Sequence, residues 1–216
     1  MKTQSSGLTF VIGGARSGKS AFAVERATAL GRPTLYVATA EAIDREMKTR
    51  IRRHRAQRPR TWRTLEEPLE FARRIASEAE EESTVIVDCL TVWLGNLLGK
   101  QLVDPNNPRV AEIEQARRLA LAELRLLCKL PQTKLVKVIV VSNEVGSGLV
   151  PPYPLGRIYR DLLGEANQFV ARHADQVVLM VAGIPVDLKA LTSRKDERRA
   201  ADALPDLADV SGEIWR

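Results

Sequence analysis

The chain has 216 residues, 44% of them hydrophobic, and this length and composition predict one globular domain with a substantial buried core. No stretch approaches the roughly 18 to 20 uninterrupted apolar residues that a membrane span requires, and residues 1–6 lack the apolar segment of a secretory signal. We therefore expect a cytoplasmic protein without a membrane span.

The formal net charge of +6 is compatible with a nucleic-acid surface, an anionic membrane surface or a site for a polyphosphate ligand. Aromatic residues make up only 5% of the chain, and they do not alternate with basic residues as they do in proteins that stack single strands. Nucleic acid is therefore the less favoured partner. Cys89 and Cys128 have no second thiol or histidine at metal-ligand spacing, so we expect apolar burial rather than metal binding.

Short apolar runs alternate with longer helical patterns along the chain. The runs predict strands at residues 8–12, 34–39, 84–90, 136–142 and 176–181, and the patterns between them include helices at residues 21–30 and 110–130. Strands that alternate with helices indicate a parallel sheet. Because most runs are continuously apolar, we expect helices to cover both faces of this sheet.

A phosphate-binding pattern follows the first predicted strand. It reads Gly13-Gly14-Ala15-Arg16-Ser17-Gly18-Lys19-Ser20, which fits G-x-x-x-x-G-K-[ST] between a strand and a helix. Backbone N–H groups of such a loop and the following helix N-terminus bind phosphate oxygens. Lys19 is expected to reach the β- and γ-phosphates, and the Ser20 hydroxyl to bind Mg²⁺. The predicted fold class is therefore α/β, a P-loop NTPase-like three-layer sandwich with a mostly parallel central sheet; a glycine-rich turn that binds nothing is the alternative.

Polar residues end two of the other predicted strands. Asp88 closes an apolar run and fits the second metal ligand that a P-loop site needs, although a carboxylate that caps the next segment is the alternative. Asn143 and Glu144 follow the run at residues 136–142. Since the carboxyl ends of parallel strands face the ligand crevice, these two residues are second-rank site candidates.

A basic segment surrounds His54. Residues 45–63 contain nine Lys or Arg residues, and Ile43, Met47, Ile51 and His54 share one face of a helix that Pro59 should end. Nearby cations disfavour imidazolium, so His54 would stay neutral and suited to attack an α-phosphate with release of pyrophosphate. Periodicity alone favours the alternative, a histidine at the edge of the core on a solvated basic helix.

An ordered set of short motifs resembles the bifunctional adenosylcobinamide kinase/adenosylcobinamide-phosphate guanylyltransferases. The set comprises residues 13–20, 36–39, 44–47, 50–51, His54, 58–59, 62–64, 143–146, Gly148, 150–151, 160–161 and 167–168. The resemblance extends over nearly the whole chain except the first six residues and the charged end. We accordingly predict a nucleotide-binding and transferase domain at residues 1–189 and a charged tail at residues 190–216.

The resemblance implies an enzyme of cobalamin biosynthesis that phosphorylates adenosylcobinamide and then joins GMP from GTP to adenosylcobinamide-phosphate. It implies Mg²⁺, GTP and ATP as the metal and nucleotides, a homo-oligomer that is a trimer, and His54 as the residue that carries the guanylyl group, with Lys19 as the second catalytic residue. Ser20 and Asp88 correspond to the metal ligands. The implied nucleotide contacts are Gly13, Gly14, Ala15, Arg16, Ser17, Gly18, Lys19, Ser20, Ala38, Thr39, Ala40, Arg55, Ala56, Gln57, Arg58, Glu66 and Asp88.

The sequence also departs from the pattern of this family. Some members carry a histidine pair in the basic helix, whereas Arg53 precedes His54 here. Two other functions remain open at this point: a P-loop small-molecule kinase without a covalent step, and a nucleic-acid-stimulated ATPase or nucleotide-switched binding protein.

Overall fold

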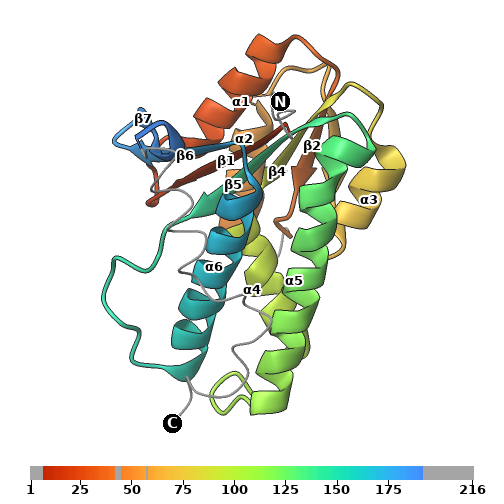
Figure 1. Cartoon of the computed structure of the whole chain (residues 1–216). Coiled ribbons are helices and arrows are strands. Elements are labelled where there is room, and N and C mark those ends of the chain that lie inside the picture. Colours follow the sequence, from red (N-terminus) through yellow and green to blue (C-terminus); the bar gives the residue numbers. More distant parts are fainter. Residues whose placement is uncertain (1–6, 42–44, 57, 192–216) are drawn as a thin grey trace.

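A mixed sheet of seven strands forms the centre of the computed structural model, which describes residues 7–41, 45–56 and 58–191 (Figure 1). The strand order is β3-β2-β4-β5-β1-β6-β7. Every neighbouring pair is parallel except β6 with β7. The strands are β1 (Leu8–Gly13), β2 (Thr34–Ala38), β3 (Arg63–Glu66), β4 (Thr84–Asp88), β5 (Lys137–Asn143), β6 (Gln176–Val181) and β7 (Ile184–Asp187).

All five predicted strands are present, and each begins and ends within two residues of its predicted bounds. The two strands that the sequence pattern missed, β3 and β7, lie at the two edges of the sheet. Three of the four residues of β3 are exposed, so this strand carries almost no apolar signal. Short polar strands of this kind are common at sheet edges, where a longer apolar strand would invite pairing with another chain.

Helices cover both faces of the sheet. Helix α1 (Lys19–Leu30) packs on one face, where Ala23 and Ala27 contact a cluster with Val11, Ile86 and Val141. On the other face lie α3 (Phe71–Glu78), α4 (Leu90–Gln101), α5 (Val110–Thr133) and α6 (Pro154–His173). Strands β2 and β4 are buried over nearly their whole length. The predicted three-layer sandwich with a mostly parallel sheet is therefore confirmed.

An aromatic pair joins helices α3 and α4. The rings of Phe71 in α3 and Trp93 in α4 meet edge to face, with their centroids 5.3 Å apart. The Trp93 indole N–H donates a hydrogen bond to the carbonyl of Leu69, at 2.9 Å. A buried tryptophan that has found a partner for its N–H fills the core without leaving an unsatisfied donor.

The predicted helices are also present. Helix α5 starts at the predicted residue and extends three residues further, and α1 begins two residues before the predicted start because Lys19 and Ser20 are already helical. The basic segment forms α2 (Arg45–Ala56), which ends before Pro59 as expected. Ile43, which the helical face was predicted to include, lies outside the described residues.

A short helix, α7 (Leu188–Leu191), ends the described chain. The predicted boundary between domain and tail at residues 189–190 falls within it, and the tail beyond lies outside the described residues, so this division stays a prediction. Within the described ranges, no helix is both long and apolar enough to cross a membrane.

Candidate active site

The segment from Gly13 to Ser20 forms a loop that leads from β1 directly into helix α1. Arg16 and Gly18 have left-handed backbone conformations, with φ angles of 56° and 97°. Lys19 is 8% exposed, and its ammonium donates to the carbonyl of Gly14 at 2.6 Å and to Ser17 Oγ at 3.4 Å. The lysine thus lies across its own loop, where its charge can meet phosphate oxygens.

The N-terminus of helix α1 is suited to bind an anion. Gly18 occupies the N-cap position, and no side chain caps the helix through a hydrogen bond. The first N–H groups of a helix have no partner within the helix, and the helix dipole places partial positive charge there. This is the arrangement that binds phosphate in other P-loops.

Neighbouring segments support the loop from both sides. The N–H of Gly183, in the turn between β6 and β7, donates to the carbonyl of Ser17 at 3.0 Å. The N–H of Glu144, which follows β5, donates to the carbonyl of Gly13 at 3.1 Å. The loop is therefore held in shape by the two strands that flank β1, rather than by its own residues alone.

The carboxyl ends of three parallel strands bring predicted site residues into one row. Ala38 at the end of β2 is in register with Glu66 of β3 on one side and with Asp88 of β4 on the other. Glu66 is exposed, and Asp88 is partly buried. Only the family resemblance indicates Glu66 as a site residue, and the sequence pattern does not predict its strand. The register explains how Glu66 reaches the same edge of the sheet as Asp88.

Tyr36 connects two of the predicted site residues. Its hydroxyl donates a hydrogen bond to Asp88 Oδ2, and the guanidinium carbon of Arg58 lies 3.3 Å from the centroid of its ring. Burial raises the pKa of Tyr36, and the nearby Asp88 carboxylate raises it further, so the hydroxyl remains a donor. Burial also lowers the pKa of Arg58, whose guanidinium nevertheless stays protonated. A carboxylate, a phenol and an arginine from three separate segments thus form one cluster.

The loop after β2 is fixed to the loop after β4. Thr39 is fully buried, and its hydroxyl exchanges hydrogen bonds with the backbone of Cys89, accepting from the N–H at 2.9 Å and donating to the carbonyl at 2.8 Å. The Asn96 amide donates to the carbonyl of Thr39 at 2.8 Å. Burial raises the pKa of the Cys89 thiol to about 11, so it stays neutral beside Asp88. The side chain of Thr39 therefore positions the strand ends.

A buried polar network lies behind β5. Ser142 Oγ donates to the side-chain oxygen of Asn167 at 2.6 Å, and the Asn167 amide donates to the carbonyl of Asn143 at 3.0 Å. The N–H of Asn143 donates in turn to the Thr91 hydroxyl at 2.9 Å. Asn143 and Glu144 are therefore held at the carboxyl edge as predicted, next to the phosphate loop.

The remaining predicted residues lie on and after helix α2. Arg55 and Ala56 are exposed at its end, and the N–H of Arg58 donates to the carbonyl of Arg55 at 3.3 Å. His54 belongs to the helix, but its side chain lies outside the described part of the structure, as does the whole of Gln57. Ala40 follows β2 and is partly buried.

The sequence matches a known family model over residues 9–188, and that model describes cobinamide kinase / cobinamide phosphate guanyltransferase. The chain belongs to this family. It is therefore an enzyme of the cobinamide kinase / cobinamide phosphate guanyltransferase family, and nucleotides are among its substrates.

Curated relatives agree with this assignment. The bifunctional adenosylcobalamin biosynthesis protein CobP of Pseudomonas aeruginosa is 45% identical over 179 residues, which cover 83% of this chain and 95% of that protein. The bifunctional adenosylcobalamin biosynthesis protein CobU of Salmonella typhimurium is 37% identical over 182 residues, covering 84% and 99%. The protein of the same name from Escherichia coli is 38% identical over 186 residues, also covering 84% and 99%.

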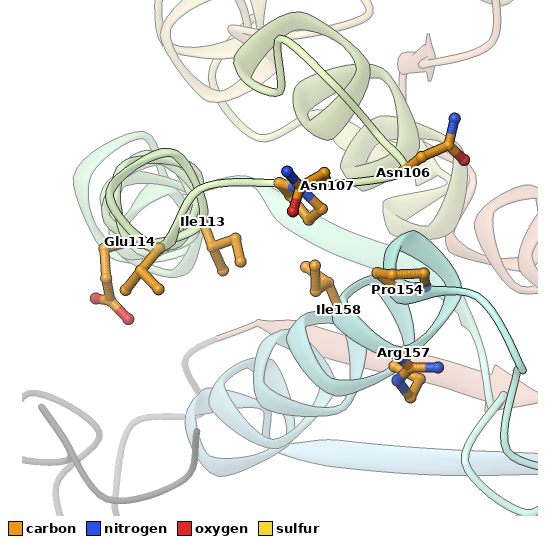
Figure 2. Close-up of a pocket in the computed structure, with 9 residues that line it drawn as sticks. Asn106, Asn107, Ile113, Glu114, Pro154, Arg157 and Ile158 are labelled. Carbon is orange, nitrogen blue, oxygen red and sulfur yellow. The ribbon is translucent and has the colours of Figure 1, made fainter. Parts of the chain in front are cut away.

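A cavity of about 270 Å³ lies away from these residues, between the starts of α5 and α6 (Figure 2). Ile113 and Ile158 project into it from the two helices, and Arg157 lies at its side. The Arg157 guanidinium already donates to the carbonyls of Pro151 and Pro152. None of the predicted nucleotide contacts lines this cavity, so it is not the phosphate site of this family member.

Two residues that support the site were not predicted to have a role in it. Tyr36 appeared in the sequence only as part of a motif, and Asn96 had no signal at all. Their roles depend on contacts between strands and helices that are distant in the sequence, so no local pattern could reveal them. The assignment of nucleotide and metal contacts to these residues stays a prediction.

Proposed function

We propose that this chain phosphorylates adenosylcobinamide and then transfers GMP from GTP to adenosylcobinamide-phosphate through a guanylyl group carried on His54. The observation that supports this most directly is the pairing of a phosphate loop with a basic helix whose following arginine, Arg58, is joined through Tyr36 to Asp88. The names of the relatives and of the family model support the pair of activities.

In the first transfer, the loop from Gly13 to Ser20 would hold the triphosphate of ATP or GTP, with Lys19 beside the β- and γ-phosphates. The aminopropanol hydroxyl of adenosylcobinamide attacks the γ-phosphorus. The bond from that phosphorus to the β,γ-bridging oxygen breaks, the nucleoside diphosphate leaves, and the hydroxyl proton is released. The loop contributes by orienting the phosphates and by neutralising charge that develops on them.

In the second transfer, a ring nitrogen of neutral His54 attacks the α-phosphorus of GTP. The α,β-bridging P–O bond breaks, and pyrophosphate leaves. A phosphate oxygen of adenosylcobinamide-phosphate then attacks the same phosphorus, the P–N bond breaks, and the imidazole is released together with adenosylcobinamide-GDP. The arginines around His54 favour the neutral imidazole and attract the anionic substrates.

The residues at the site fit Mg²⁺. Hydroxyl and carboxylate oxygens are the ligands that this ion prefers, and Ser20 and Asp88 supply one of each. Among the described residues, Tyr36 donates to Asp88 through Oδ2, which leaves Oδ1 for another ligand. Mg²⁺ bound by these residues would neutralise phosphate charge during both transfers.

The proposal is tested by intact-protein mass spectrometry after incubation with GTP and Mg²⁺. We expect a mass increase of one GMP in the native chain and none in His54→Ala. His173→Ala is the matched control, because this second histidine is exposed at the end of α6 and contacts the Phe169 carbonyl at 2.8 Å. An adduct in folded His54→Ala protein, or none in the folded native chain, would contradict the covalent step.

A second assay separates the two activities. Transfer of labelled γ-phosphate to adenosylcobinamide should survive in His54→Ala and fall at least about 100-fold in Lys19→Ala, because the Lys19 ammonium lies against the phosphate loop whereas His54 belongs to helix α2. If phosphoryl transfer survives in His54→Ala while the native chain forms no GMP adduct, the protein is a simple kinase.

We propose that the enzyme is a homotrimer that works in the cytoplasm without nucleic acid. Exposed apolar side chains of the described residues support self-association: Val103, Val110, Leu149, Val150 and Tyr153. Of these, Val110 lines the cavity of Figure 2. Leu149 and its neighbour Val150 are 96% and 61% exposed, and contiguous exposed apolar surface marks protein–protein interaction sites. Sedimentation equilibrium should give three times the chain mass of 24.0 kDa, and a monomer at every concentration would exclude the trimer.

A further inference from the structure

We propose that Tyr36 is a positioning residue that orients the Asp88 carboxylate for metal binding and, with its ring, holds Arg58 beside the same carboxylate. The inference rests on the proposed function, because it assumes that Asp88 binds Mg²⁺ and that Arg58 contacts the nucleotide. It adds a residue to which neither the predicted contacts nor the family description assigns a role.

The Tyr36 side chain has little room to change its orientation. It lies in the middle of β2, is only 2% exposed, and belongs to the cluster that packs under helix α1. Its neighbours in register are Ile86 of β4 and Thr64 of β3. A ring fixed in this way presents its hydroxyl to the next strand from a defined direction, so the hydrogen bond can select one orientation of the Asp88 carboxylate.

The hydrogen bond uses one oxygen of the carboxylate. Because Tyr36 donates to Oδ2, rotation of the Asp88 carboxylate is restrained and Oδ1 is presented to another ligand. Residues that hydrogen-bond to a metal-binding side chain commonly change metal affinity about 10- to 100-fold when they are replaced. Tyr36 stands in that relation to Asp88.

The face of the same ring supports Arg58. The guanidinium carbon lies 3.3 Å from the ring centroid, a stacking arrangement that a planar guanidinium makes and an ammonium does not reproduce. The Arg58 Nε atom is buried without a hydrogen-bond partner among the described residues. The stacked ring is therefore one of the contacts that hold the guanidinium, and it joins the chain that follows α2 to the tyrosine that hydrogen-bonds to Asp88.

The first experiment compares Tyr36→Phe with the native chain. A fluorescent GTP analogue is titrated at increasing Mg²⁺ concentration, so the readout needs no turnover. We expect the Mg²⁺ concentration for half-maximal binding to rise about 10-fold, with Mg²⁺-free binding unchanged. Tyr159→Phe is the matched control, because that partly buried tyrosine donates at 3.0 Å to the Thr91 carbonyl rather than to Asp88.

The second experiment tests the contact between the Tyr36 ring and Arg58. Arg58→Lys keeps the positive charge but loses the planar face, so Mg²⁺-free binding of the analogue should weaken on the order of 5-fold, whereas Tyr36→Phe should not weaken it. Chemical denaturation of each variant shows whether it is folded.

Two results would overturn the proposal. If Tyr36→Phe and Tyr159→Phe have the same Mg²⁺ dependence as the native chain, the Tyr36 hydroxyl does not orient a metal ligand. If Arg58→Lys binds the analogue as tightly as the native chain, the ring does not position a nucleotide contact. Failure of the covalent step would appear separately, as a missing GMP adduct in a native chain that still binds nucleotide.

Discussion

Replacement of Gly13 by alanine should destabilise the fold through one defined contact. A Cβ atom at this position would lie 2.4 Å from the carbonyl oxygen of Met180 and 2.8 Å from Ser17 Oγ. The serine can rotate away, but Met180 is backbone of β6 and is paired in register with Gly13. Either β6 or the start of the phosphate loop must therefore move, and overpacking of this kind lowers the free energy of unfolding by about 1–3 kcal/mol.

Urea denaturation measures this loss. With a denaturant slope of about 2 kcal/mol per molar, the midpoint of Gly13→Ala should fall by about 0.5–1.5 M. Gly14→Ala is the matched control, because no heavy atom lies within 4 Å of the Cβ position there, and its free energy of unfolding should change by less than about 0.5 kcal/mol. Equal midpoints for the two variants would refute the close approach between the loop and β6.

Two further substitutions test hydrogen-bonded side chains inside the fold, Asn167 behind β5 and Glu123 between helices α5 and α3. Asn167→Ala removes the partner of the Ser142 hydroxyl and of the Asn143 carbonyl, and urea denaturation should show a loss of about 1–3 kcal/mol; an unchanged midpoint would show that the network is dispensable. Burial raises the pKa of Glu123, which accepts a hydrogen bond from the Ala72 N–H, so the stability it contributes is present in acid and lost as the pH rises through the raised pKa. Relative to the native chain, Glu123→Gln should therefore gain stability between acid and neutral pH, and a difference that does not change with pH would contradict this.

Much of the fold was predictable because the relevant signals are local. The central strands are continuous apolar runs, and the phosphate loop has a fixed spacing between a strand and a helix, so both are visible in the sequence. The edge strand β3 has a single buried residue, Leu65, and forms because β2 offers it backbone partners. No local pattern carries that information.

The site was predictable in part for the same reason. Lys19 and Asp88 follow from motif and strand end, whereas the order of the strands decides which ends become neighbours. Glu66 and Asp88 are 22 positions apart in the chain and meet across Ala38 only in the folded sheet. The contact between Tyr36 and Arg58 likewise depends on how the chain returns after α2.

The strand order also constrains how one nucleotide could serve the phosphate loop and the basic helix. Strands β1 and β2 are separated by β5 and β4, and since neighbouring strands lie about 4.8 Å apart, their carboxyl ends are about 14 Å apart. The phosphate loop follows β1 and α2 follows β2. A triphosphate with its terminal phosphates in the loop must therefore run along the carboxyl edge for its α-phosphate to approach α2, and Asp88 at the end of β4 lies on that path. If Asp88 binds Mg²⁺ as proposed, the ion can contact phosphates during either transfer. Loss of the hydrogen bond from Tyr36 to this carboxylate should then affect both activities together.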